Sequence, residues 1–297
     1  MNILSRLWDR FAESVAIRTY RRVYFAQRRD YLLQLTMHTS QSGVMPKNDD
    51  EQAEIIISLT THSRRLSDAW LAIESVMQGT VLPHRIILWI DEKRKQEPLP
   101  ILIQNQQRRG LEVCYTQDIG PYTKLIPALQ KYPDATIVTI DDDILYPADM
   151  LEGLINASVR HPRAICANRV VEMTTDKKGN VAPLRSWLQT KNFDQACDNF
   201  FFEAVAGVLY PAHSLFAETT NRDLFMQLSP TADDIWFNAM ARKQQTPIVA
   251  VNEHNELPYL WVNESMQSDA LHIQNNNPQK PLNDLQFQSV WSYFGLS

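Results

Sequence analysis

The sequence predicts an α/β protein in which helices flank a mainly parallel β-sheet. Between residues 54 and 161, short apolar runs that suit buried strands alternate with amphipathic stretches that suit helices. This alternation is typical of parallel strands joined by right-handed helical crossovers. Polar residues gather where the predicted strands end, and sheets of this kind bind ligands at that edge. With 44% hydrophobic residues in a chain of 297, a sizeable core is expected without disulfides.

Composition and short motifs exclude several classes of protein. The formal net charge of −5 argues against nucleic-acid binding by the chain as a whole. The three cysteines form no C-x-x-C pair, which argues against a disulfide framework or a cysteine zinc site and suits a reducing compartment. No dinucleotide or P-loop glycine motif follows a predicted strand. No apolar run reaches roughly 18 residues and no secretory signal is evident, so we expect a cytoplasmic protein.

A helical arm is predicted over residues 1–40. This stretch has no glycine or proline, and apolar side chains recur at helical spacing at Leu4, Leu7, Trp8, Phe11 and Val15. Residues 1–30 carry seven arginines against three acidic residues, a local charge of +4. The arm therefore either packs on the main domain or a partner subunit, or rests peripherally on the anionic inner face of a membrane. Residues 41–52 are typical of a linker to a domain over 53–297.

Each element of that domain follows from its local sequence. Apolar runs predict strands over 54–60, 85–91, 111–115, 135–140, 164–168, 203–210 and 247–251. Helical spacing predicts helices over 66–77, 99–109, 123–131 and 147–161, and from Thr231 onward. Gly79 and Gly110 end two helices, and Pro147 begins another, where its missing N–H is not needed.

Three consecutive carboxylates, Asp141, Asp142 and Asp143, follow the predicted strand 135–140. In an extended chain, Asp141 and Asp143 point to the same side and Asp142 to the other. Adjacent carboxylates repel one another unless a cation compensates, and Mg²⁺ or Mn²⁺ commonly binds one or two carboxylates together with substrate phosphates. The alternative is a solvated acidic turn at the end of a strand.

These motifs together resemble a glycosyltransferase of the GT-A fold over roughly residues 53–255. The strand Ile-Ile-Ser-Leu-Thr-Thr, residues 56–61, comes first, and a later strand ends in the D-x-D of Asp141 and Asp143. The similarity is closest to the family-2-like bacterial enzymes that build lipopolysaccharide or capsule. It implies a UDP-linked nucleotide-sugar donor, a saccharide or glycolipid acceptor, and Mn²⁺ or Mg²⁺ as cofactor. It also implies a nucleotide-binding half, about 53–168, and an acceptor half, about 169–297.

The resemblance assigns the nucleotide to the ends of the first two strands. Thr60, Thr61 and Arg64 would contact the base, ribose or phosphates, with helix capping as the alternative role of the two threonines. Asp91 would read the base or ribose, or else close a strand-end turn.

The diphosphate and the metal fall to later residues. Lys124 would approach the diphosphate, unless it is an ordinary exposed lysine. Asp143 would bind the metal, and Asp141 the ribose, the metal or both, with Asp142 beside them. Gly207 would let the backbone approach the donor sugar, or else mark a bulge in a core strand. His254 or His272 is a candidate for a further metal ligand.

The resemblance also implies a catalytic base at the acidic pair Asp233 and Asp234. An inverting transfer needs a carboxylate that takes the proton of the acceptor hydroxyl. The family pattern favours Asp234, yet Thr231 and Asp234 also fit a capping box, which would leave Asp233 free. Both remain candidates, and a purely structural role at the helix N-terminus is the alternative.

The resemblance thus implies metal-dependent transfer of a sugar to a saccharide hydroxyl of a bacterial surface glycan. The transfer inverts the anomeric carbon if the acidic pair supplies the base, whereas in a retaining enzyme the pair would instead position the acceptor. Two alternatives stay open. A nucleotidyltransferase shares a similar α/β layout and releases pyrophosphate, but usually carries a glycine-rich N-terminal loop that this chain lacks. A non-catalytic binding module would keep the fold without turnover.

Overall fold

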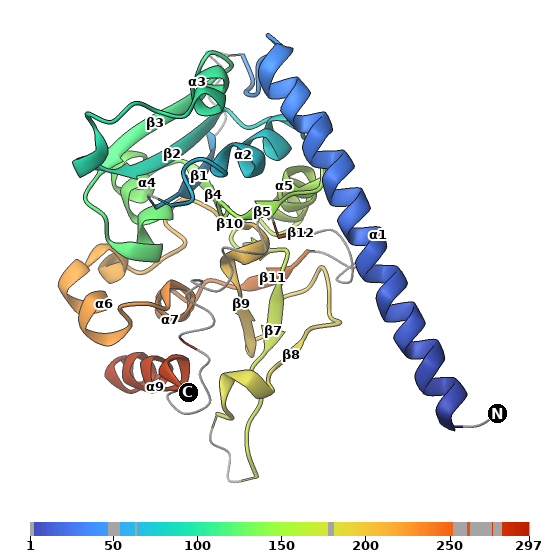
Figure 1. Ribbon diagram of the computed structural model, residues 1–297. Coiled ribbons are helices and arrows are strands. Elements are labelled where there is room, and N and C mark those ends of the chain that lie inside the picture. The colour runs from blue at the N-terminus through green and yellow to red at the C-terminus, as the bar shows by residue number, and fades with distance from the viewer. Residues whose placement is uncertain are drawn as a thin grey trace.

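A computed structural model describes residues 3–46, 54–62, 64–177, 181–251, 260–261, 275 and 281–296. A twisted sheet runs through the body, and one long helix extends along its side (Figure 1). His254 and His272, the two candidates for a further metal ligand, lie outside the described residues.

The central sheet has the strand order β11-β6-β10-β4-β1-β2-β3 in the described part of the chain. Its strands are β1 (Ile55–Thr60), β2 (Arg85–Asp91), β3 (Leu111–Thr116), β4 (Thr136–Thr139), β6 (Ile165–Ala167), β10 (Val208–Tyr210) and β11 (Ile248–Ala250). All neighbouring pairs are parallel except those of β10, which runs antiparallel to β4 and β6. The predicted class, an α/β protein with a mainly parallel sheet, is confirmed.

Helices and turns fill the connections between strands. The helices of the domain are α2 (Ala69–Met77), α3 (Ile101–Gln107), α4 (Ile126–Lys131), α5 (Met150–Arg160), α6 (Arg222–Leu228), α7 (Asp233–Lys243) and α9 (Leu282–Phe294). Short 3₁₀ turns are η1 (Glu92–Arg94), η2 (Gly120–Lys124), η3 (Leu184–Ser186), η4 (Ala204–Ala206) and η5 (Ala217–Thr220). Two small antiparallel sheets pair β5 (Ile144–Leu145) with β12 (Leu260–Trp261), and β7 (Val170–Glu172) with β8 (Leu188–Gln189) and β9 (Phe200–Phe202).

Alternate side chains of the central strands pack into two separate cores. Ile56 and Ile87 face one core, with buried side chains from α4, α7 and α9. Ile57 and Leu88 face the other, with α2, α3 and α5. Because successive residues of a strand point to opposite faces, the continuous apolar runs of β1 and β2 are those expected of strands buried on both sides.

The predicted arm forms a single helix, α1 (Ile3–His38). Only its C-terminal part is buried among the residues whose side chains are described: Leu32 is fully buried, and the Thr36 hydroxyl donates to Glu74 Oε2 at 2.9 Å. Glu74 is also bridged by Arg109, whose Nη1 lies 2.8 Å from both carboxylate oxygens. The helix then extends away from the body toward its N-terminus (Figure 1), with Tyr20 63% exposed. The packing interpretation therefore accounts for the end of the arm.

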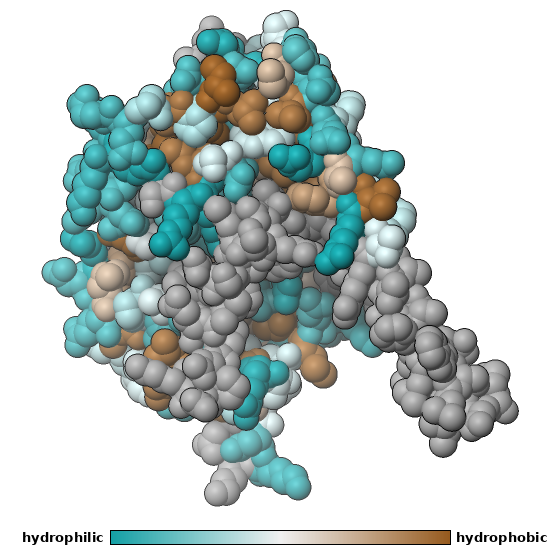
Figure 2. Space-filling model, in the orientation of Figure 1, coloured by the Kyte–Doolittle hydropathy of each residue, from teal (hydrophilic) through white to brown (hydrophobic). Residues whose placement is uncertain are grey.

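No helix in the described residues is long and apolar enough to cross a membrane. On the face drawn in Figure 2, hydrophobic residues lie in small groups among hydrophilic ones.

Three predicted elements differ in the structure. The helix expected from Pro147 begins at Met150, because 147–149 form a turn in which Met150 N–H donates to Pro147 C=O at 3.2 Å. The helix expected over 123–131 is a 3₁₀ turn, η2, followed by α4. The strand expected over 203–210 is interrupted by η4 and by Gly207, whose φ of +98° breaks the extended backbone, so only β10 remains.

Candidate functional site

The acidic segment 141–143 lies beside the loop that follows β1. Strands β1 and β4 are parallel neighbours, with Ser58 opposite Thr139, so the chain segments that leave them meet at the same edge. The Thr61 hydroxyl donates to Asp142 Oδ2 at 2.5 Å. Both Asp142 and Asp143 are buried. Burial raises the pKa of Asp142, against the opposing effects of Arg65 and Thr61.

Arg65, which the sequence interpretation did not select, contacts the acidic segment 141–143. Its Nη1 lies 3.0 Å from Asp142 Oδ1 and 2.9 Å from Asp143 Oδ2, so one guanidinium nitrogen bridges two carboxylates. Burial acts to lower the pKa of Arg65, but Asp142 and Asp143 outweigh it and raise the pKa. Thr60 has a different role, since its hydroxyl donates to Trp89 C=O at 3.1 Å. Neither threonine caps α2, whose N-cap is Asp68, so the capping alternative is wrong.

Lys124 is buried at the centre of the site, so the alternative of an ordinary exposed lysine is wrong. Its Nζ lies 2.9 Å from Asp141 Oδ1 and 3.2 Å from Asp233 Oδ2. The Ser58 hydroxyl of β1 donates to Lys124 C=O at 2.5 Å and fixes its backbone. Burial acts to lower the pKa of Lys124, but Asp141 and Asp233 hold it well above its usual range. One ammonium group therefore connects a carboxylate that follows β4 with a carboxylate at the start of α7.

The acidic pair lies at the N-terminus of α7, and its members have different partners. Asp233 is buried against Lys124, whereas Asp234 is half-buried and its Oδ1 accepts the Ala204 N–H at 3.2 Å. Burial and the nearby charge of Asp233 raise the pKa of Asp234 well above its usual range. The adjacent carboxylates thus sit in unlike environments, which is a common arrangement where one of a pair handles protons.

The predicted capping box is not formed. The N-cap of α7 is Ala232, with no side-chain cap. The Thr231 hydroxyl lies 2.9 Å from Asn275 Oδ1 and 3.2 Å from Gln286 Oε1. These distant partners take up the hydroxyl that the capping box requires, so the argument that Asp234 is occupied by capping no longer holds.

Tyr146 is a second residue that sequence reasoning missed. Its hydroxyl accepts the Asp141 N–H at 2.8 Å and donates to Val205 C=O at 3.0 Å. It thereby ties the acidic segment to the η4 segment that also contacts Asp234. Its position three residues after Asp143 was the available signal, but a tyrosine there is equally consistent with the core.

Gly207 directly follows η4, and its lack of a side chain has a packing reason. A Cβ built on it would lie 3.0 Å from Met150 Sδ, and φ is +98°. We therefore expect Gly207→Ala to lower the free energy of unfolding by about 1–3 kcal/mol, the usual cost of strain at such a backbone conformation. Chemical denaturation measures this change. Gly153→Ala, where a Cβ would lie 3.6 Å from Val251 Cγ1, is the matched control, and an equal effect in both variants would contradict the expectation.

Two further predicted nucleotide residues lie at the end of β2 and in the loop after β1. The Asp91 carboxylate accepts Lys93 N–H at 3.2 Å and closes the turn η1, which is its alternative structural role. Among the described residues, no hydrogen bond or ion pair joins Asp91 to Asp141–Asp143. Arg64 is exposed on the same loop as Arg65. Burial and the charge of Arg65, with a smaller contribution from Arg64, lower the pKa of the neighbouring His62 imidazole.

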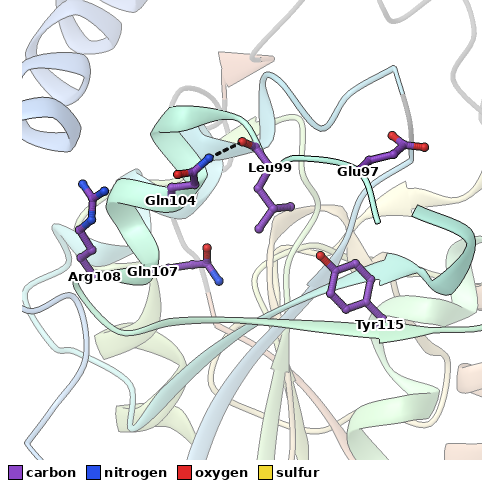
Figure 3. A pocket seen from close by; sticks show the side chains of 6 residues that line it. All are labelled: Glu97, Leu99, Gln104, Gln107, Arg108 and Tyr115. Atoms are coloured by element: carbon purple, nitrogen blue, oxygen red, sulfur yellow. Dashed lines mark hydrogen bonds between the residues drawn. The ribbon is translucent and has the colours of Figure 1, made fainter. Parts of the chain in front are cut away.

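A cavity of about 570 Å³ lies elsewhere, between α3 and β3. Figure 3 shows its lining, which consists of Glu97, Leu99, Gln104, Gln107, Arg108 and Tyr115. None of the predicted site residues lines it. This cavity is therefore separate from the acidic site.

Comparisons with known proteins do not assign the chain to a family. No family model matches the sequence. No curated protein matches it. Among solved structures, the chain is similar to 4-diphosphocytidyl-2C-methyl-D-erythritol synthase from Anaerococcus prevotii at 12% sequence identity, with a TM-score of 0.46. That match covers 72% of this chain and 92% of the other.

Proposed function

We propose that the protein is a glycosyltransferase of the GT-A type that moves a sugar from a UDP-linked donor to a saccharide hydroxyl. The observation that supports this most is the position of Lys124, whose Nζ lies within 3.2 Å of carboxylates from both Asp141 and Asp233. A buried cation at the end of the strands can approach a donor diphosphate, and a carboxylate pair on its other side can approach an acceptor.

The acidic site favours a divalent cation as cofactor. Among the described residues, the cations Lys124 and Arg65 contact four carboxylates, those of Asp141, Asp142, Asp143 and Asp233, and Asp234 lies next to Asp233. This surplus negative charge would repel a diphosphate unless a further cation is present. Carboxylate oxygens are the donors that Mg²⁺ and Mn²⁺ prefer, so the residues fit such an ion.

Asp143 and Asp141 would hold this ion, which would supply charge neutralisation for the diphosphate and the leaving nucleotide. No three His, Cys, Asp or Glu side chains among the described residues converge as a metal cage. From its described residues the protein would supply one or two ligands, with phosphate and water as the others. Lys124 adds a fixed positive charge beside them.

Proton transfer is assigned to Asp234. Asp233 is paired with Lys124, whereas Asp234 forms no ion pair with another described residue and has a raised pKa. A base with a pKa nearer neutrality is better matched to an acceptor hydroxyl at physiological pH. The acceptor oxygen, on losing its proton to Asp234, would attack the anomeric carbon while the bond to the nucleoside diphosphate breaks on the opposite face, which inverts that carbon.

The products distinguish this proposal from the alternatives. With a UDP-sugar, Mn²⁺ and a saccharide acceptor, we expect release of UDP and no pyrophosphate. Pyrophosphate release from a nucleoside triphosphate and a sugar phosphate would instead support a nucleotidyltransferase. A non-catalytic module would give neither product, and its partner binding would survive Asp143→Ala, whereas in an enzyme this variant loses turnover.

The arm is proposed to bring the enzyme to a membrane that carries a glycolipid acceptor. Beyond the packed end of α1, the helix exposes Tyr20, Val23, Tyr24 and Tyr31, and Arg22 and Arg29 lie among them. Tyrosine and arginine together suit the boundary between anionic headgroups and acyl chains.

We expect the intact protein to co-sediment with vesicles that contain anionic lipid. The double variant R22Q/R29Q should bind them roughly thirtyfold more weakly, at about 1 kcal/mol for each arginine. Vesicles of neutral phosphatidylcholine are the control. If the intact protein binds neither kind of vesicle, the arm has only its packing role.

A further inference from the structure

The carboxylate that the proposed function assigns to the metal already has a cation from the chain itself. Arg65 Nη1 lies 2.9 Å from Asp143 Oδ2 and 3.0 Å from Asp142 Oδ1. The contact with Asp142 is a charge-assisted hydrogen bond, and the contact with Asp143 is an ion pair. A divalent ion that binds Asp143 would bring a second cation to the same carboxylate.

Of the groups in this contact, Arg65 is the one that can move away. Asp142 also accepts the Thr61 hydroxyl, so it stays tied to the β1 loop without Arg65. The Arg65 side chain is 15% exposed, and it belongs to the turn 64–68 rather than to a helix or strand. The partly exposed guanidinium can therefore turn away from its partners, whereas the Asp142 carboxylate is held by Thr61.

The charge around the site would change with such a release. With Arg65 on Asp142 and Asp143, the acidic segment has Arg65 on one side and Lys124 on the other. A divalent ion would replace one charge by two. The released guanidinium would keep its charge close by and could pair with a phosphate through two parallel hydrogen bonds.

From this geometry we infer that Arg65 competes with the divalent ion for Asp143, and that ion binding transfers its guanidinium to the donor diphosphate. The inference rests on the proposed function. Under this inference, Arg65 binds Asp143 when the ion is absent and the donor diphosphate when the ion is present. Its contact with Asp143 is therefore not a permanent structural ion pair.

The sign of one affinity change tests this inference. Binding of Mn²⁺ alone is measured by the loss of the free-ion electron paramagnetic resonance signal. If Arg65 competes, Arg65→Gln should bind Mn²⁺ about tenfold more tightly than the unaltered protein, since a charge-assisted contact no longer has to be broken. If Arg65 instead holds the carboxylates in place, the same variant should bind Mn²⁺ more weakly, which overturns the inference.

Arg64→Gln is the matched control, because it removes the same charge from the adjacent position. An equal gain in both variants would mean that overall charge, and not the contact with Asp143, sets the affinity, which also overturns the inference. Arg65→Lys should fall between the unaltered protein and Arg65→Gln. Thermal unfolding of each variant establishes that it is folded.

UDP binding in the presence of Mn²⁺ separates this inference from the proposed function. Arg65→Gln should bind UDP more weakly although it binds Mn²⁺ more tightly, because the variant lacks the guanidinium that pairs with the diphosphate. UDP binding without any Mn²⁺ binding would overturn the inference and leave the donor assignment standing. Absence of UDP binding in the unaltered protein would instead overturn the proposed function.

Discussion

Replacement of Lys124 by methionine should destabilise the fold and abolish donor binding together. The ammonium group contacts Asp141 and Asp233 in a buried position, so its removal leaves carboxylates without their counter-charge. Loss of one partner of a buried pair costs about 3–5 kcal/mol. Chemical denaturation and calorimetric titration with UDP measure the two effects.

The exposed Lys95 provides the control, since Lys95→Met removes the same charge without a buried partner. In the double variant K124M/D141N, a carboxylate is neutralised as well, so we expect part of the stability to return. Donor binding should not return with it, because the cation for the diphosphate is still missing. Unchanged stability and unchanged UDP affinity in Lys124→Met would contradict the role assigned to this residue.

Asp234→Asn should keep donor binding and lose transfer. General-base catalysis typically contributes about 10²–10⁴-fold to the rate, so kcat should fall by that factor while the KM for the donor changes little. Asp223→Asn, an exposed acidic residue in the first turn of α6, is the matched control. If Asp234→Asn turns over normally and Asp233→Asn does not, the base is Asp233.

The pH profile gives the same assignment a second test. A base must be ionised to accept a proton, and the pKa of Asp234 is raised by burial and by Asp233. The rate should therefore fall as the pH falls through this raised pKa, at a higher pH than for an ordinary aspartate. Residual activity of Asp233→Asn should show the same limb displaced to lower pH, because the neighbouring charge is removed.

Local sequence was enough to predict the sheet and the edge at which polar residues meet. Apolar runs predicted β1, β2, β3 and β4. Because these strands pair in parallel, the chain segments that follow them lie at the same edge of the sheet. Asp141–Asp143 and the loop after β1 indeed contact one another through Thr61 and Asp142. Such adjacency follows from chain direction alone and does not depend on side-chain detail.

The contacts that define the site depend on long-range packing and could not be predicted in this way. Lys124 and Asp233 are more than one hundred residues apart, and they meet because α7 packs against the same face of the sheet as α4. Likewise, the Thr231 capping box failed because Asn275 and Gln286 approach the hydroxyl from the C-terminal region. Arg65 was overlooked in favour of Arg64, since two adjacent arginines in a loop give no local indication of which one turns inward.

The most direct test of the account is calorimetric titration of nucleoside phosphates into the purified protein with and without Mn²⁺. The account predicts that UDP binds, that Mn²⁺ strengthens this binding, and that Asp143→Ala loses the strengthening by the metal. GDP and CMP extend the titration to other donor classes. If none of the three nucleotides binds in either condition, the assignment of a nucleotide-sugar donor site to this edge of the sheet is contradicted.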